Sequence, residues 1–385
     1  MLTETKVYSN KDIIKAGKIL SKMKDYSTEE IDFAFSALSY WRYSHNTALL
    51  KAYNFVGESS KEIDKYSIVA KRLKRKESII YKLVRFKGMS LRSMNDIAGC
   101  RVIISDLKKA RRLLRGLKKD EHFQREIGYK INDYIEKPQE DGYRGVHIIS
   151  KFENDEGKLL NVEIQIRTLL QHYWATSVEI IDILTGQNLK QKKGERKWSH
   201  FFQLVSDQFS NMDDIQSFVQ LEEVEQKKRY SEFLANLSPP YIEKNWDGLV
   251  RIRQLSRDLD VSRRLRAFAA SVKVIEEHLK SDERTGYVLV ELDVKKNILK
   301  TRTFLESESR AAEAKLTEIE RREFSRKDFI CALVSTNSIS GLKEAFPNYF
   351  ADSTNFITFL KLIEEAAMFV KPNRFVKFMS WLKLP

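Results

Sequence analysis

Apolar residues recur at helical spacing through the first 58 residues of the chain. Ser27 and Glu30 stand three residues apart, as in a capping box, where each side chain bonds the backbone N–H of the other residue. Apolar side chains then follow at Ile31, Phe33, Phe35, Leu38 and Trp41. We therefore predict a helical N-terminal region over residues 1–60.

The pattern changes after residue 60, where short runs typical of strands alternate with amphipathic segments. Val102–Ile104 is a β-branched run that predicts a buried strand. Val146–Phe152 and Leu160–Ile166 flank a turn-rich segment and predict a hairpin. Helices are expected over Ser78–Arg85, Leu107–Leu117 and Leu169–Leu184, and a basic, mobile loop over Gly186–His200.

Helical, charged sequence continues over residues 201–280, and we assign residues 216–284 to a helical connector. A separate module is predicted over residues 285–385, with the order ββαβα of a small α+β unit. Its predicted elements are a hairpin of Tyr287–Leu292 and Leu299–Phe304, a helix over Glu306–Glu323, a strand over Phe329–Val334, and helices over Ser340–Ala345 and Asn355–Phe369.

The positive charge of the chain is concentrated in one block. The formal net charge is +14, and residues 71–130 hold 19 Lys and Arg against 6 Asp and Glu. Such a block favours a polyanionic partner, either nucleotide phosphates or a nucleic-acid backbone. The alternative interpretation is a solvated helix face.

Two cysteines, Cys100 and Cys331, are too few for a disulfide framework and are expected to be small hydrophobic residues, Cys100 in a buried element and Cys331 in a strand. The first twenty residues lack the apolar core of a signal peptide, and no apolar run approaches the ~18 residues of a membrane span. We expect a cytoplasmic protein without a membrane partner.

Cations and a hydroxyl gather at the start of the basic block. Arg72 and Lys74 precede a predicted helix on which Ser78 and Lys82 lie four residues apart and share a face. An ammonium beside a hydroxyl, with further cations one turn back, suits a triphosphate.

Two carboxylates lie next to or within predicted strands. Asp96 precedes the strand at Val102, where a turn or capping role is the alternative. In the later strand Glu163, Gln165 and Arg167 alternate with isoleucines and therefore point to one side of the sheet. Asp96 and Glu163 together could hold Mg²⁺ against phosphate oxygens. Tyr143, after Gly142, offers a ring on which a base could stack.

These segments carry a resemblance to a known family. DIAGCRV at residues 96–102, DYIEKPQEDGYRGVH at residues 133–147 and VEIQIRT at residues 162–168 resemble the synthetase domain of the RelA/SpoT alarmone enzymes. The order and spacing of the motifs carry the resemblance, which spans Tyr66 to Ile183. It implies a nucleotidyltransferase-like domain over residues 61–215, of class α+β, with a mixed β-sheet flanked by helices.

The resemblance also implies an activity and a set of residue roles. The family transfers pyrophosphate from ATP to the 3′-hydroxyl of GTP or GDP. It implies that Asp96 and Glu163 are catalytic and hold Mg²⁺, that Glu163 helps to deprotonate the attacking hydroxyl, and that Tyr143 stacks on the acceptor base. The implied ATP-binding residues are Arg72, Lys74, Ser78, Lys82 and Arg101, and the implied acceptor-binding residues are Tyr143, Arg144, His147, Gln165 and Arg167.

The acceptor side departs from the family pattern. Asn132, Gln139 and Asp141 stand where the family typically has two lysines and an asparagine, whereas the donor side is intact. An acceptor without a 5′-polyphosphate would lose little by this change. One alternative hypothesis is therefore the same transfer to the 3′-CCA end of tRNA, as a growth-arresting toxin or phage-defence effector. Transfer to an adenine nucleotide is another alternative, because the resembled family includes small toxic synthetases that make adenosine alarmones.

Two further questions stay open at this stage. An inactive nucleotide- or RNA-binding module is the alternative of another class, although a bare binder would not need a carboxylate pair. No His-Asp dipeptide occurs, so the metal hydrolase motif of bifunctional relatives is absent. The C-terminal module could neutralise the enzyme or sense a protein trigger, and a homo-oligomer is compatible with the resemblance.

Overall fold

The structure is a computed structural model that describes residues 7–74, 76–125, 129–185, 196–237, 239–266, 286–293, 298–323, 329–335 and 349–369. It contains two compact units. One unit is Met1–Glu136 with Gly145–Thr168, and the other is Lys137–Arg144 with Leu169–Pro385. The short segment before Gly145 joins the second unit because it packs on a helix far along the chain.

A five-stranded mixed sheet forms the centre of the first unit, as the predicted fold class requires. Its order is β1-β2-β5-β4-β3, and only the β2–β5 pair among these neighbours is parallel. The strands are β1 (Ile68–Leu73), β2 (Ala98–Ile104), β3 (Lys130–Asp133), β4 (Val146–Glu153) and β5 (Leu159–Thr168). β4 and β5 form the predicted hairpin, turned at Gly157, whose φ of +72° suits glycine.

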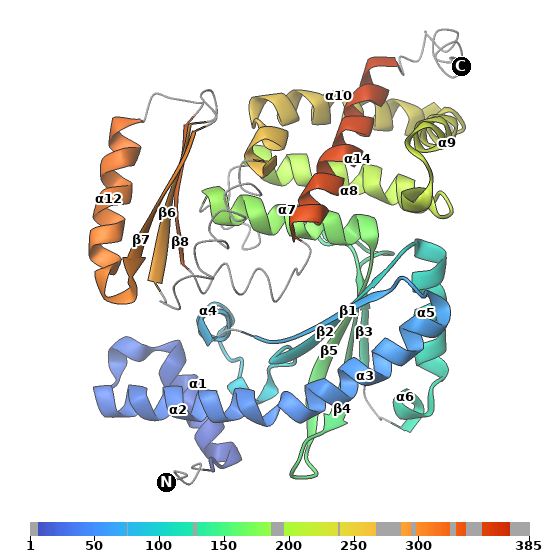
Figure 1. The fold of residues 1–385 in the computed structure, drawn as a ribbon. Coiled ribbons are helices and arrows are strands. Elements are labelled where there is room, and N and C mark those ends of the chain that lie inside the picture. Colours follow the sequence, from blue (N-terminus) through green and yellow to red (C-terminus); the bar gives the residue numbers. More distant parts are fainter. Residues whose placement is uncertain are drawn as a thin grey trace. The chain divides into compact units, whose positions relative to one another are not determined.

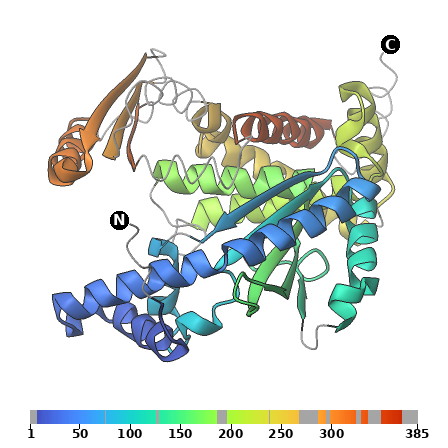
Figure 2. The ribbon, with the colours of Figure 1, turned by 60° about the horizontal axis from the view of Figure 1, so that its bottom comes forward.

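Helices cover the apolar face of this sheet. α3 contacts β1, β2, β4 and β5, and it lies along the sheet in Figures 1 and 2. The predicted capping box forms at the start of α2, where Ser27 and Glu30 bond each other's backbone N–H. The helices of this unit are α1 (Asn10–Ser21), α2 (Thr28–Ser44), α3 (Asn46–Ile63), α4 (Lys76–Arg85), α5 (Leu107–Lys119) and α6 (Glu121–Arg125), with 3₁₀ turns at Met23–Asp25 and Leu91–Ser93.

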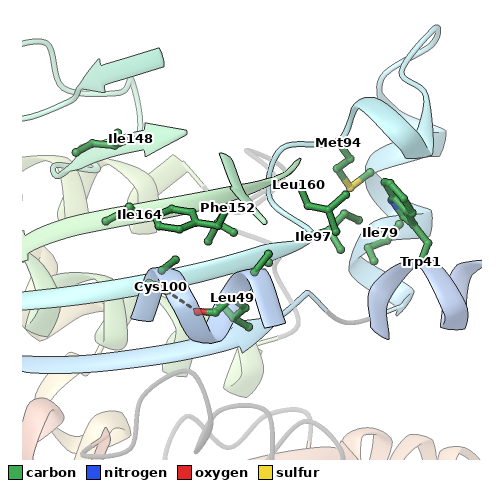
Figure 3. Close-up of a cluster of buried hydrophobic side chains, with 14 of the residues drawn as sticks. Trp41, Leu49, Ile79, Met94, Ile97, Cys100, Ile148, Phe152, Leu160 and Ile164 are labelled. Carbon is green, nitrogen blue, oxygen red and sulfur yellow. Dashed lines mark hydrogen bonds between the residues drawn. The ribbon is translucent and has the colours of Figure 1, made fainter. Parts of the chain in front are cut away.

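The core between α3 and the sheet is aliphatic and aromatic. Figure 3 shows Cys100, Ile164 and Phe152 from three strands beside Leu49 of α3. The thiol of Cys100 donates a hydrogen bond to the Leu49 carbonyl (3.8 Å), and burial raises its pKa to about 12. Cys100 is thus a small core residue, as the sequence indicated.

The second unit is built around packed helices. These are α7 (Leu169–Thr185), α8 (Arg196–Asp213), α9 (Glu223–Ala235), α10 (Pro239–Asp258) and α14 (Tyr349–Phe369), with a 3₁₀ turn at Phe218–Gln220. The prediction of a basic loop over Gly186–His200 is wrong for its last five residues, because α8 already begins at Arg196. Trp198, in the first turn of this helix, is buried in the helical core. The rest of that loop lies outside the described residues.

A small antiparallel sheet, ordered β7-β6-β8, belongs to the same unit. Its elements are β6 (Gly286–Asp293), β7 (Ile298–Leu305), a 3₁₀ turn at Glu306–Glu308, α12 (Ser309–Arg322) and β8 (Phe329–Ser335), in the predicted order, with α12 against the sheet (Figure 1). The helix predicted over Asn355–Phe369 is present within α14 and completes the order ββαβα. α14 packs on α7 and α10, with Phe356 and Phe359 in their core, because its apolar residues match that core. The helix predicted at Ser340–Ala345 lies outside the described residues.

No helix within the described ranges is both long and apolar enough to cross a membrane.

Candidate active site

Strand register gathers polar side chains on the face of the first unit's sheet opposite α3. Arg101 of β2 pairs with Gln165 of β5, which pairs with His147 of β4. Arg72 of β1 pairs with Gly99 of β2, which pairs with Glu163. Since paired residues point to the same side of a sheet, all five side chains share one face. The alternation predicted for residues 162–168 is confirmed.

Glu163 lies at the centre of this face and is held in its ionised form. Its Oε1 lies 3.1 Å from His147 Nδ1, and its Oε2 accepts a hydrogen bond from Gln165 Nε2 (2.7 Å). Burial raises the pKa of Glu163, but the His147 contact, the Gln165 bond and the charge of Lys74 outweigh it and hold the pKa at about 2. Arg167 donates to Gln165 Oε1 (3.1 Å), which orients the amide.

Asp96 forms the second anionic centre, just before β2. Its Oδ2 accepts a hydrogen bond from Lys74 Nζ and its Oδ1 pairs with Lys82 Nζ, each at 2.9 Å. Burial raises the pKa of Asp96, and the two ammonium groups more than offset that effect, so the pKa is lowered. Lys74 binds Asp96 directly, and its charge also lowers the pKa of Glu163.

The remaining predicted residues lie in several places. Arg72 is exposed on β1, Arg101 is buried on β2, and Ser78 is exposed one turn before Lys82 on α4. Tyr143 and Arg144 belong to the second unit. There the Tyr143 ring lies 6.4 Å from the Trp174 ring, and Arg144 contacts α8.

Three supporting residues escaped sequence reasoning. Arg42 of α2 donates a hydrogen bond from Nε to the Lys74 carbonyl (2.7 Å), which fixes the backbone at that lysine. The Tyr134 ring packs edge-on against His147, with centroids 5.2 Å apart. Arg111 of α5 pairs with Asp133. Only Tyr134 carried a signal, its place within the DYI motif.

The donor set fits a magnesium ion accompanied by phosphates. Asp96 and Glu163 supply ionised oxygen ligands of the kind Mg²⁺ prefers, and Mg²⁺ usually takes one or two carboxylates with substrate phosphates and water. In the described part of the chain no group of three or more His, Cys, Asp or Glu could hold a metal.

The lowered pKa of Glu163 makes a prediction about acid stability. A carboxyl group with a lowered pKa contributes its full stabilisation of the fold at pH values above its ordinary pKa of 4.5. This contribution is lost as the pH falls towards 2. We expect the wild type to exceed a Glu163→Gln variant by up to about 3 kcal/mol in unfolding free energy at pH 7, with the difference shrinking below pH 4.5. Urea unfolding of both proteins between pH 7 and pH 3 measures this difference. A difference that stays constant with pH would contradict the assigned pKa.

Comparison with known proteins agrees with this geometry. The mixed sheet, with acids and cations on one face, defines an α+β domain suited to a phosphate-bearing ligand. Residues 71–180 match the model of the region found in RelA/SpoT proteins, the same part of the chain in which the motifs indicated a resemblance.

Several relatives are similar over part of their length. The chain is 33% identical over 114 residues to GTP pyrophosphokinase YwaC of Bacillus subtilis, covering 27% of this chain and 52% of that protein. It is 29% identical over 174 residues to GTP pyrophosphokinase YjbM of the same organism, covering 42% and 76%. The crystal structure of small alarmone synthetase 1 from Bacillus subtilis, bound to its product pppGpp, is 24% identical with a TM-score of 0.38, covering 47% of this chain and 96% of that one. The chain thus spans about half the length of YwaC.

Proposed function

We propose that this protein is an ATP-dependent pyrophosphokinase that transfers pyrophosphate from ATP to the 3′-hydroxyl of a guanine nucleotide and so makes a (p)ppGpp-type alarmone. The observation that carries the proposal is the pair of ionised carboxylates: Asp96, which the ammonium groups of Lys74 and Lys82 bind, and Glu163, on the polar face of the sheet. The match of residues 71–180 and the names of the relatives support the same activity.

The cations of the site bind the donor, ATP. Lys74 and Lys82 bind Asp96 in the structure, and both ammonium groups can turn to the phosphates of ATP. Arg72, exposed on the same sheet face as Glu163, adds a third cation. Asp96 and Glu163 would hold Mg²⁺, which supplies charge neutralisation at the transferred phosphates.

The acceptor oxygen attacks the β-phosphorus of ATP. A bond forms between the 3′-oxygen and that phosphorus, the bond to the α-phosphate oxygen breaks, AMP leaves, and the hydroxyl proton passes to solvent. With a pKa of about 2, Glu163 is a poor proton acceptor. We assign it to metal holding and to orientation of the hydroxyl, and its help in deprotonating that hydroxyl, which the resemblance also implied, stays a prediction.

The test is transfer of label from γ-³²P-ATP with Mg²⁺ to GDP, GTP, adenine nucleotides or bulk tRNA, each offered separately. We expect label on the guanine nucleotides. Label on tRNA or adenine nucleotides alone would overturn the guanine assignment. It would also indicate that Asn132, Gln139 and Asp141 adapt the site to a different acceptor. Retained ATP binding without transfer to any acceptor would instead support the inactive binding module.

A further inference from the structure

The turn that carries Tyr143 is fastened to α8, a helix outside the matched residues 71–180. The turn closes on itself through hydrogen bonds from Gly142 N to the Gln139 carbonyl (2.9 Å) and from Gln139 N to the Tyr143 carbonyl (3.1 Å). The Asp141 carboxylate accepts from Tyr143 N at 2.9 Å. These bonds shape the turn, and its place in the unit is set by contacts with α8.

Ser206 of α8 is the centre of those contacts. Its hydroxyl donates to the Gly142 carbonyl and accepts from Arg144 Nε (3.2 Å), and the residue is 3% exposed. Asp207, next along the helix, accepts from the other end of the same guanidinium at 2.8 Å. One arginine thus ties the turn to two consecutive residues of α8.

Gly142 makes this close approach possible. Its φ is +91°, a conformation that side chains rarely adopt. A Cβ at this position would lie 3.0 Å from the Gln203 Cα and 3.2 Å from the Ser206 Cβ. Only glycine therefore allows the turn to approach α8 this closely at residue 142.

We propose that Ser206 and Asp207 are positioning residues for acceptor binding, and that Arg144 acts with them as an anchor of the turn rather than as a ligand of acceptor phosphates. The proposal rests on the proposed function and on Tyr143 as the base-stacking residue. It assigns to a helix outside the matched residues 71–180 the task of presenting that ring.

A comparison of variants separates an anchor from a ligand. If Arg144 anchors the turn, then Ser206→Ala, Asp207→Asn and Arg144→Ala each raise the acceptor KM about 3- to 10-fold, the fold-change expected from one or two lost hydrogen bonds, and leave the KM for ATP unchanged. The Arg144→Ala/Asp207→Asn double variant then has an acceptor KM no higher than the higher of the two single-variant values. If Arg144 instead binds acceptor phosphates, Asp207→Asn frees its charge and lowers the acceptor KM, which would overturn the proposal.

A structural readout accompanies the kinetics. We expect amide hydrogen exchange in the segment 137–144 to speed up about 3- to 10-fold in Ser206→Ala, with Ser210→Ala, one turn further along α8, as the matched control. Unchanged exchange in Ser206→Ala would overturn the proposal even where the protein is active. A wild type that labels no acceptor counts against the proposed function alone, because exchange still measures whether α8 holds the turn.

Discussion

Replacing Glu163 by glutamine is expected to lower the rate of pyrophosphate transfer at least ~100-fold while leaving the fold intact. The amide keeps the shape of the side chain but removes the negative charge that His147 contacts. Initial rates of label transfer from γ-³²P-ATP measure the effect. Glu153→Gln is the matched control, because Glu153 lies on β4 of the same hairpin, is exposed and pairs only loosely with Lys51. A Glu163→Gln protein that retained most of its activity would refute the metal-holding role.

Asp96→Asn is expected to reduce transfer by a similar factor, at least ~100-fold, for a different reason. Asp96 is the shared partner of Lys74 and Lys82, and its side chain is only 18% exposed. The variant loses one of the two carboxylates available to the metal and leaves two neighbouring cations without their common anion. We therefore expect tighter binding of ATP in the absence of Mg²⁺ together with slower transfer.

Rates with Mg²⁺ and equilibrium binding of a non-hydrolysable ATP analogue without metal measure these two effects. Asp32→Asn, at an exposed position on α2, serves as the control for a lost surface charge. Unchanged transfer by Asp96→Asn would remove Asp96 from the site, and the turn or capping role would then be sufficient.

The parts of the fold that sequence predicted are those with local signals. The hairpin of β4 and β5 has two alternating strands around a glycine turn, and its prediction is confirmed. β1 and β3 were missed, because Lys71 and Arg72 make β1 look like basic loop and β3 is only four residues long. Both strands owe their place to pairing with better-marked neighbours, which is a non-local property.

The candidate site likewise has features that the sequence predicts and features that it does not. Alternation along β5 predicted that Glu163, Gln165 and Arg167 share a face, since this depends only on strand geometry. The bonds from Lys74 and Lys82 to Asp96 join residues from different elements, and no spacing rule predicts them. Ser206 carried no signal at all, because it stands more than 60 residues from the turn that it contacts.

The buried thiol of Cys100 offers a direct way to follow the opening of the first unit. Its side chain is 1% exposed, it bonds the Leu49 carbonyl, and its pKa of about 12 keeps it protonated at neutral pH. Alkylating reagents attack thiolates, so Cys100 reacts only in molecules whose sheet has separated from α3. In a Cys331→Ser protein it is the sole cysteine. The rate of its modification then reports how often this unit unfolds, and nucleotide binding at the site should slow that rate.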